Sequence, residues 1–180
     1  MDVHTQSFLN NHPCFNKGAS VNWGRVHLPV APNCNIQCNF CNRMYDCANE
    51  NRPGVTQKVY TPDEAVAYLE KLFKDRQDIS VIGIAGPGDP MCDADKTLPT
   101  FEKCRARFPH LMLCLSTNGL ALPEHVDDIV RIGVSHVTVT VNAVTPSVGG
   151  KVYAWVRYNG KTYTGEEGAA ILLARQDEGI

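Results

Sequence analysis

Three cysteines, Cys34, Cys38 and Cys41, lie close together, with three and then two residues between them. Thiolates are soft ligands that favour zinc, copper(I) or iron–sulfur clusters. A structural zinc site normally completes its tetrahedron with a second pair of ligands, and no fourth cysteine follows at a matching distance. The spacing therefore indicates three corners of a four-iron cubane whose fourth iron is left for something other than cysteine. We call residues 33–41 the cluster loop.

Two other uses of a cysteine cluster are weighed against this one. A disulfide set needs an oxidising compartment, but the polar N-terminus lacks the apolar segment of a signal peptide. The expected location is therefore cytoplasmic, where thiols stay reduced and clustered cysteines more often bind metal or do chemistry. A zinc-binding module without catalytic activity stays open as an alternative.

The length, composition and net charge limit the classes of protein to which this chain can belong. The chain has 180 residues, which suits one domain with a sizeable core. Its hydrophobic fraction of 43% and charged fraction of 20% are typical of a soluble globular protein. The net charge of −2, without a basic run, gives no reason to expect a nucleic-acid partner. No apolar run approaches the roughly eighteen residues of a membrane span, so no membrane association is expected.

The elements that must position the cysteines follow from the apolar pattern. Residues 1–24 are interpreted as an irregular segment that contains two potential metal ligands, His12 and Cys14. Residues 25–180 are interpreted as the core domain. Strands are expected at 25–30, 79–85, 111–116 and 136–141. Helices are expected at 61–75, 98–108, 123–132 and from 165 towards 179. Thr61 with Glu64, and Thr164 with Glu167, have the spacing of capping boxes at the first and last of these helices.

The alternation of strands and helices predicts an α/β fold with parallel strands and right-handed crossover helices. A closed (β/α) TIM barrel takes about 250 residues, so four strands predict a partial TIM-like barrel, truncated after about four strands, with an open side. Barrel chemistry sits at the C-terminal ends of the strands. The cluster loop follows the first strand, and the turn Gly86-Pro87-Gly88-Asp89-Pro90 follows the second.

The pattern Cys-x3-Cys-x-Phe-Cys at 34–41 resembles the signature of the radical S-adenosylmethionine (SAM) enzymes. That resemblance implies that the open iron holds the amino and carboxylate groups of SAM. The turn at 86–90 resembles the Gly-Gly-Glu-Pro-type segment that binds the SAM amino group, with Asp89 in the acidic position. The residues implied to bind the cofactor are Phe40, beside the adenine, with Gly86, Gly88, Asp89, Asn118 and Asn142.

Longer stretches resemble the NifB family, the radical SAM maturases of the nitrogenase iron–molybdenum cofactor. The resemblance covers nearly the whole chain. It rests on the residues at 12–16, 25–32, 42–50, 52–56, 83–90, 116–119, 136–143, 155–158 and 161–165. It implies an enzyme of lyase type that fuses two [4Fe–4S] clusters and inserts a carbide taken from a SAM methyl group. The product would be an eight-iron precursor for nitrogen fixation.

The same resemblance assigns residue roles. Cys34, Cys38 and Cys41 would hold the SAM-cleaving cluster. Two further [4Fe–4S] clusters would be substrates, with the implied ligands Cys14, His27, Cys47 and Cys114 and the exchangeable candidate Glu50. Implied partners are an iron–sulfur cluster donor, an electron donor and the carrier or scaffold proteins of later cofactor assembly. Full-length relatives carry the rest of the barrel and a further Cys-x-x-Cys, so the chain alone is expected to lack full activity.

Two residues have no place in that pattern. Cys92 and Cys104 are interpreted as ordinary buried or surface thiols. Another radical SAM enzyme, acting on an organic or peptide substrate, would explain the three loop cysteines and the glycine turn. It would leave the additional ligand set unexplained, and it stays open as an alternative at this point.

Overall fold

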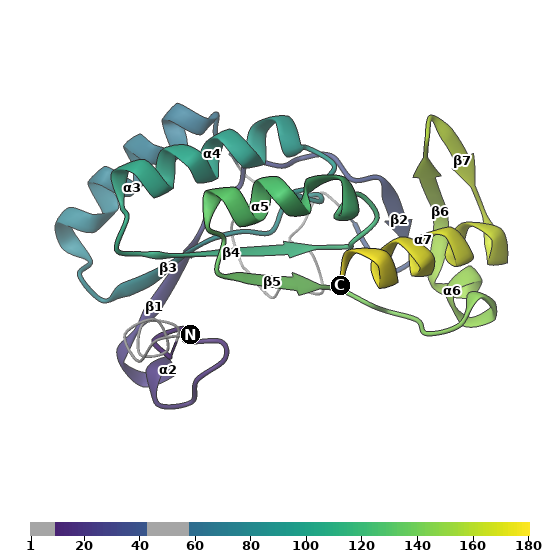
Figure 1. The fold of residues 1–180 in the computed structure, drawn as a ribbon, viewed down its shortest axis with the longest axis horizontal. Helices are drawn as coiled ribbons and strands as arrows, with labels where there is room; N and C mark the ends of the chain where they lie inside the picture. Colours follow the sequence, from purple (N-terminus) through teal and green to yellow (C-terminus); the bar gives the residue numbers. More distant parts are fainter. Residues whose placement is uncertain (1–9, 43–57) are drawn as a thin grey trace.

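The computed structural model describes residues 10–42 and 58–180. Four strands form its main sheet in the order β1-β3-β4-β5, and every neighbouring pair is parallel. The strands are β1 (Gly24–His27), β3 (Ile79–Ile84), β4 (Met112–Thr117) and β5 (His136–Val139). The predicted α/β fold, a parallel sheet with crossover helices, is confirmed and is consistent with a partial radical SAM barrel (Figure 1).

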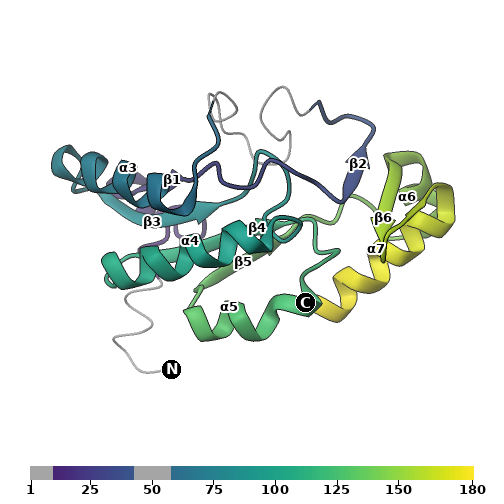
Figure 2. The same cartoon turned by 90° about the horizontal axis from the view of Figure 1, so that it is seen from above.

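Three helices cover one face of this sheet (Figures 1 and 2). They are α3 (Pro62–Asp75), α4 (Ala94–Arg107) and α5 (Val126–Ile132), the last preceded by a 3-10 turn, η1 (Pro123–His125). Strands β3 and β4 are buried along their whole length. Ile82 of β3 and Leu113 of β4 share one core with Phe101 of α4. A strand buried on both faces reads as a continuous apolar run, and that run made β3 and β4 predictable.

The predicted capping box at the start of α3 is confirmed. The Thr61 hydroxyl accepts from the Glu64 N–H at 3.3 Å, and the Glu64 carboxylate accepts from the Thr61 N–H at 2.9 Å. The second predicted box, at α7 (Gly165–Gly179), is wrong because the Thr164 side chain makes no capping hydrogen bond. Gly165, the first residue of the helix, has φ +58°, so the first turn lacks the regular helical geometry in which an N-cap side chain reaches the N2 or N3 N–H group.

A second, three-stranded sheet lies beyond the C-terminal ends of β4 and β5 (Figure 1). It pairs β2 (Ile36–Cys38), β6 (Tyr153–Tyr158) and β7 (Lys161–Tyr163) in antiparallel fashion. The helix α6 (Pro146–Val152) precedes β6, and α7 packs on both α6 and β6. None of these three strands is among the strands expected from the sequence, and β2 is the hardest to foresee because it lies inside the cluster loop and has only three residues.

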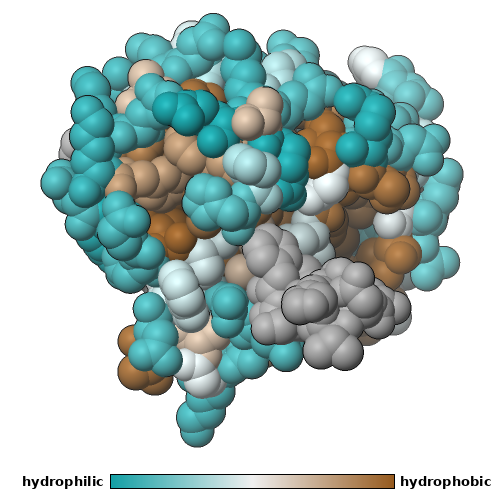
Figure 3. Space-filling model, turned by 60° about the vertical axis from the view of Figure 1, so that its left-hand side comes forward, coloured by the Kyte–Doolittle hydropathy of each residue, from teal (hydrophilic) through white to brown (hydrophobic). Residues whose placement is uncertain are grey.

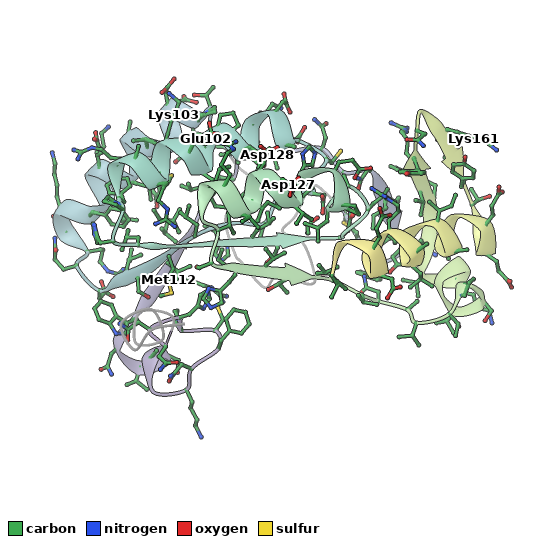
Figure 4. All side chains as sticks on the ribbon, viewed as in Figure 1. Glu102, Lys103, Met112, Asp127, Asp128 and Lys161 are labelled. Atoms are coloured by element: carbon green, nitrogen blue, oxygen red, sulfur yellow. The ribbon has the colours of Figure 1, made fainter. Side chains whose placement is uncertain are left out.

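The N-terminal segment is more ordered than the irregular segment expected for residues 1–24. Its described part contains α2 (Ala19–Asn22), and the His12 side chain is completely buried. Figure 1 shows α2 on the side of the main sheet opposite α3–α5, and Figure 4 places the Met112 side chain on that same side. The Ser80 hydroxyl donates to the Asn11 carbonyl at 2.9 Å, which ties the segment to β3.

The face drawn in Figure 3 is mainly polar, and apolar residues show in its hollows. Within residues 10–42 and 58–180, no helix has both the length and the apolar character needed to cross a lipid bilayer.

Candidate functional site

A cavity lies at the C-terminal ends of the main-sheet strands. It is enclosed by the cluster loop, the turn after β3 and the residues that end β4 and follow β5. Eight of the predicted site residues line it: Cys34, Cys38, Phe40, Cys41, Gly88, Asp89, Asn118 and Asn142. Gly86 lies two residues before Gly88 and is outside this lining. The structure therefore brings residues from 34 to 142 of the chain together around one space.

The entrance of the cluster loop is fixed by Asp93, a residue that the sequence analysis did not single out. The buried Asp93 carboxylate accepts from the Asn33 backbone N–H and from its side-chain amide, each at 2.7 Å. The turn after β3 docks on the same segment, because the Gly88 N–H donates to the Ala31 carbonyl at 2.6 Å. A Cβ atom at Gly88 would lie 1.9 Å from the Asn33 carbonyl oxygen, so only glycine permits this approach.

The remainder of the loop is held by side-chain amides and by β6. The Gln37 amide donates to the carbonyl oxygens of Cys38 and Cys41, each at 2.9 Å. The Arg157 backbone N–H donates to the Asn35 carbonyl at 2.8 Å, and the Asn118 amide donates to the Asn35 side-chain oxygen at 2.7 Å. The carbonyl groups of Asn35, Cys38 and Cys41 thus accept hydrogen bonds within the protein, and the three cysteines line the cavity.

Asp89 is buried beneath the cavity, and its carboxylate is bound by the protein. It accepts from the backbone N–H groups of Asn118 at 2.5 Å, Met91 at 3.0 Å and Cys92 at 3.2 Å. The Thr117 hydroxyl lies 3.0 Å from both carboxylate oxygens. Burial raises the pKa of Asp89, and these hydrogen bonds oppose that shift. This carboxylate fixes the end of β4, and its predicted contact with the SAM amino group stays a prediction.

The three loop cysteines line one cavity, and thiolates are the usual ligands of iron–sulfur clusters. Cys38 is buried, Cys34 and Cys41 are partly buried, and all three thiols face the same cavity. In the described residues, no three His, Cys, Asp or Glu side chains are placed to hold one metal ion. A cubane presents a separate iron to each thiolate, so its ligands surround a volume and do not converge on a point.

Comparison with known proteins settles the family. Residues 28–167 match the Radical SAM superfamily. This chain belongs to the radical SAM superfamily. It is 49% identical, over 93% of its length, to the FeMo cofactor biosynthesis protein NifB of Chlorobaculum tepidum, of which it covers 40%. It is 49% identical over its whole length to the NifB protein of Sinorhizobium fredii, of which it covers 36%. The chain thus spans two fifths or less of these relatives' length.

In the radical SAM superfamily, a [4Fe–4S] cluster and SAM act together, and the cavity residues have the chemistry for both. The thiolates of Cys34, Cys38 and Cys41 are iron ligands. Asn118 and Asn142 also line the cavity and bring amide groups to it, and the exposed ring of Phe40 borders the same space. The donor set therefore fits a cluster with a bound polar cosubstrate.

Three of the predicted substrate-cluster ligands, Cys14, His27 and Cys114, are not in the lining of this cavity. They belong to the N-terminal segment and to strands β1 and β4 of the main sheet. His27 pairs with Gly83, and Gly83 pairs with Cys114, so these residues form one row across β1, β3 and β4. A Cβ atom at Gly83 would lie 2.9 Å from the His27 ring, which shows that the imidazole lies over the glycine. Cys14 is exposed and its thiol contacts the Arg25 guanidinium. Cys47 and Glu50 lie outside the described residues.

Proposed function

We propose that this chain supplies the SAM-cleaving part of a nitrogenase cofactor maturase, a lyase-type radical SAM enzyme. The full reaction would join two [4Fe–4S] clusters and insert a carbide from a SAM methyl group, giving an eight-iron precursor. The proposal is supported by the shared cavity of the three loop cysteines, the turn after β3 and Asn118. It is supported further by the 49% identity with NifB proteins. An alternative radical SAM activity on an organic substrate has no comparable support.

The chain's own residues would bind and orient the cluster and SAM and would exclude water from the cavity, while the cofactor supplies the difficult chemistry. Cys34, Cys38 and Cys41 would hold the [4Fe–4S] cluster, which supplies the electron for reductive cleavage of SAM. Pro87, Gly88 and Asp89 of the turn after β3 line the same cavity as these cysteines. Asn118 contacts the cluster loop through Asn35 and through the Cys34 sulfur at 3.7 Å, so it would set the distance between cluster and cosubstrate.

Substrate clusters would be held by Cys14, His27, Cys47 and Cys114. A mixed set suits cargo that must be bound and released, because imidazole is a weaker, protonatable ligand than thiolate. The partners of this function would be an iron–sulfur cluster donor, an electron donor and a downstream cofactor carrier.

The test compares Cys38→Ala with Cys104→Ala after anaerobic reconstitution with iron and sulfide. Cys38 lines the cavity, whereas Cys104 is a residue of α4 whose side chain is completely buried in the hydrophobic core. Cys38→Ala should abolish 5′-deoxyadenosine formation from SAM under dithionite, and Cys104→Ala should retain it. Equal 5′-deoxyadenosine formation by both variants would refute the assignment of the loop cysteines.

A second measurement separates a maturase from another radical SAM enzyme. The chain should bind more iron than the roughly four atoms of one cubane, and Cys114→Ala should lower bound iron without changing the spectrum of the loop cluster. An iron content of one cubane in both forms would favour a radical SAM enzyme that acts on an organic substrate.

A further inference from the structure

A groove separate from the cavity also reaches the cluster loop. We call it the outer groove, and it is lined by Asn33, Cys34, Asn35, Cys92, Asp93, Trp155 and Arg157. Cys34 lines both the outer groove and the cavity, whereas Cys38 and Cys41 line the cavity. A cluster held by Cys34 can therefore be approached from two directions, and SAM would occupy only the cavity.

Two side chains of β6, Trp155 and Arg157, face the outer groove. They are two positions apart on the strand, so they leave the same face of it, and the Arg157 guanidinium lies 5.2 Å from the centroid of the Trp155 ring. The opposite face of β6 is covered by α7, because the buried Val156 shares a core with Leu172. The tryptophan and arginine pair is thus on the face of the small sheet that α7 does not cover.

The backbone of β6 fixes this pair relative to the cysteines. Trp155 is paired with Gln37 of the cluster loop, and the Arg157 backbone N–H donates to the Asn35 carbonyl at 2.8 Å. Substitution of either side chain keeps these backbone groups in place. The pair therefore lies at a defined position beside Cys34, on the strand that is hydrogen-bonded to the loop.

The exposed charge at the outer groove is positive. Its lining contains two charged residues, Asp93 and Arg157. The Asp93 carboxylate is buried, accepts two hydrogen bonds from Asn33 and lies 3.8 Å from Nζ of Lys96. Arg157 is exposed, and residues 129–165, which include β6 and β7, contain no Asp or Glu. In a chain of net charge −2, this is a local excess of positive charge, and it favours an acidic partner.

The proposed function needs an electron to reach the loop cluster while SAM is bound in the cavity. A protein that delivers this electron must approach the cluster from another side, and the outer groove reaches Cys34 from such a side. Tryptophan and arginine are the residues most enriched at the energetic centres of protein interfaces. Encounters between electron-transfer proteins use small, transient interfaces, which suits a groove of this size.

We propose that the outer groove is the docking surface of the electron donor, a small acidic protein of the ferredoxin class with a low-potential iron–sulfur cluster. Carboxylates of this carrier pair with Arg157, and its surface packs on Trp155. One electron passes from the reduced carrier to the cluster held by the loop cysteines. The carrier is oxidised by one electron, the loop cluster is reduced by one, and no bond or proton is transferred. This inference rests on the proposed function, because it assigns a surface to the electron donor of that function.

The kinetic test uses a reduced [2Fe–2S] ferredoxin as the only reductant and measures 5′-deoxyadenosine formation by the reconstituted chain. Arg157→Glu should slow this reaction about ten-fold at an ionic strength of about 0.02 M, and the difference should shrink at about 0.5 M. Arg157→Lys keeps the charge and should stay within about two-fold of the unsubstituted chain. Lys74→Glu makes the same charge change at an exposed position of α3 and should have no effect. With dithionite, which needs no docking surface, all four chains should react equally.

A binding measurement tests the surface without catalysis. The chain has two tryptophans, Trp155 in the outer groove and the exposed Trp23 near β1. Fluorine NMR of the reconstituted chain labelled with fluorotryptophan gives one line for each, and Trp23→Phe assigns them. Titration with oxidised ferredoxin should shift or broaden the Trp155 line and leave the Trp23 line unchanged. Arg157→Glu should remove that response.

Equal ferredoxin-driven rates for Arg157→Glu and the unsubstituted chain would overturn the inference, and so would a ferredoxin that perturbs Trp23 and leaves Trp155 unchanged. A flavodoxin-class carrier that responds to Arg157→Glu, when the ferredoxin does not, would overturn the choice of partner. Failure of the proposed function is a different result, because then no 5′-deoxyadenosine forms even with dithionite. The NMR titration reports on docking in either case.

Discussion

Asp89→Asn is the substitution that best separates a structural from a ligand-binding role in this site. The change keeps the shape of the side chain and replaces one carboxylate oxygen with an NH2 group. In one orientation the NH2 group would face the Asn118 N–H, and in the other it would face the N–H groups of Met91 and Cys92. Either orientation sets two donors against each other in a buried position.

The cost can be worked from these contacts. Each buried N–H left without an acceptor costs about 1–3 kcal/mol, and at least two such groups result. Removal of a buried negative charge offsets part of this loss, because burial disfavours the ionised form of Asp89. We therefore expect the free energy of unfolding to fall by about 2–4 kcal/mol, a large share of the roughly 5–15 kcal/mol typical of a domain.

The measurement is urea unfolding of the iron-free chain, followed by circular dichroism under anaerobic conditions. With a slope of about 2 kcal/mol per molar urea, the midpoint should fall by about 1–2 M. Asp177→Asn, the same chemical change at an exposed position of α7, should leave the midpoint within about 0.3 M. An Asp89→Asn chain as stable as the unsubstituted one, but unable to bind SAM after reconstitution, would refute the structural role. The carboxylate would then contact SAM directly.

Three further predictions follow from close packing. Gly88→Ala would place Cβ 1.9 Å from a backbone oxygen of the cluster loop, so we expect a loss of about 3 kcal/mol in urea unfolding and no loop cluster on reconstitution. Gly83→Ala would push against the His27 ring at 2.9 Å; because the ring can rotate, we expect about 1–2 kcal/mol and reduced total iron with normal SAM cleavage. Gly24→Ala, whose Cβ would meet nothing nearer than 3.6 Å, is the control for both. Burial raises the pKa of Cys104 to about 12, so at pH 8 about one thiol in 10⁴ is ionised, and iodoacetamide should modify Cys104 only in unfolded chain.

Much of the fold could be predicted because its signals are local. The parallel strands β3 and β4 are continuous apolar runs, and Thr61, Pro62 and Glu64 mark the start of α3 within four residues. The second sheet could not be predicted in the same way. Its strand β2 has three residues and pairs with β6, more than a hundred positions later. Such pairing depends on tertiary contacts and leaves no period in the sequence.

The same distinction between local and long-range signals applies to the residues of the site. The approach of Cys34, Cys38 and Cys41 to one cavity could be predicted because all three lie in one short loop, so their spacing is visible in the sequence. The role of Asp93 could not, since its partner Asn33 is sixty residues away and both are common loop residues. The row that places His27 and Cys114 on one face could not be predicted either, because it depends on the register of β1, β3 and β4, which the sequence alone does not fix.

The position of Asn118 shows how the distant parts of the chain act on the site together. Its backbone N–H is held by Asp89 from the β3 side, while its carbonyl accepts from the Gln176 amide at 2.7 Å. The same amide donates to the Thr140 carbonyl at 3.0 Å, so α7 joins the ends of β4 and β5 beside the cavity. Gln176 is almost completely buried, which makes these bonds costly to break. Because the Asn118 side chain contacts the cluster loop, a change in α7 can alter cluster and SAM binding although α7 contributes no residue to the cavity lining.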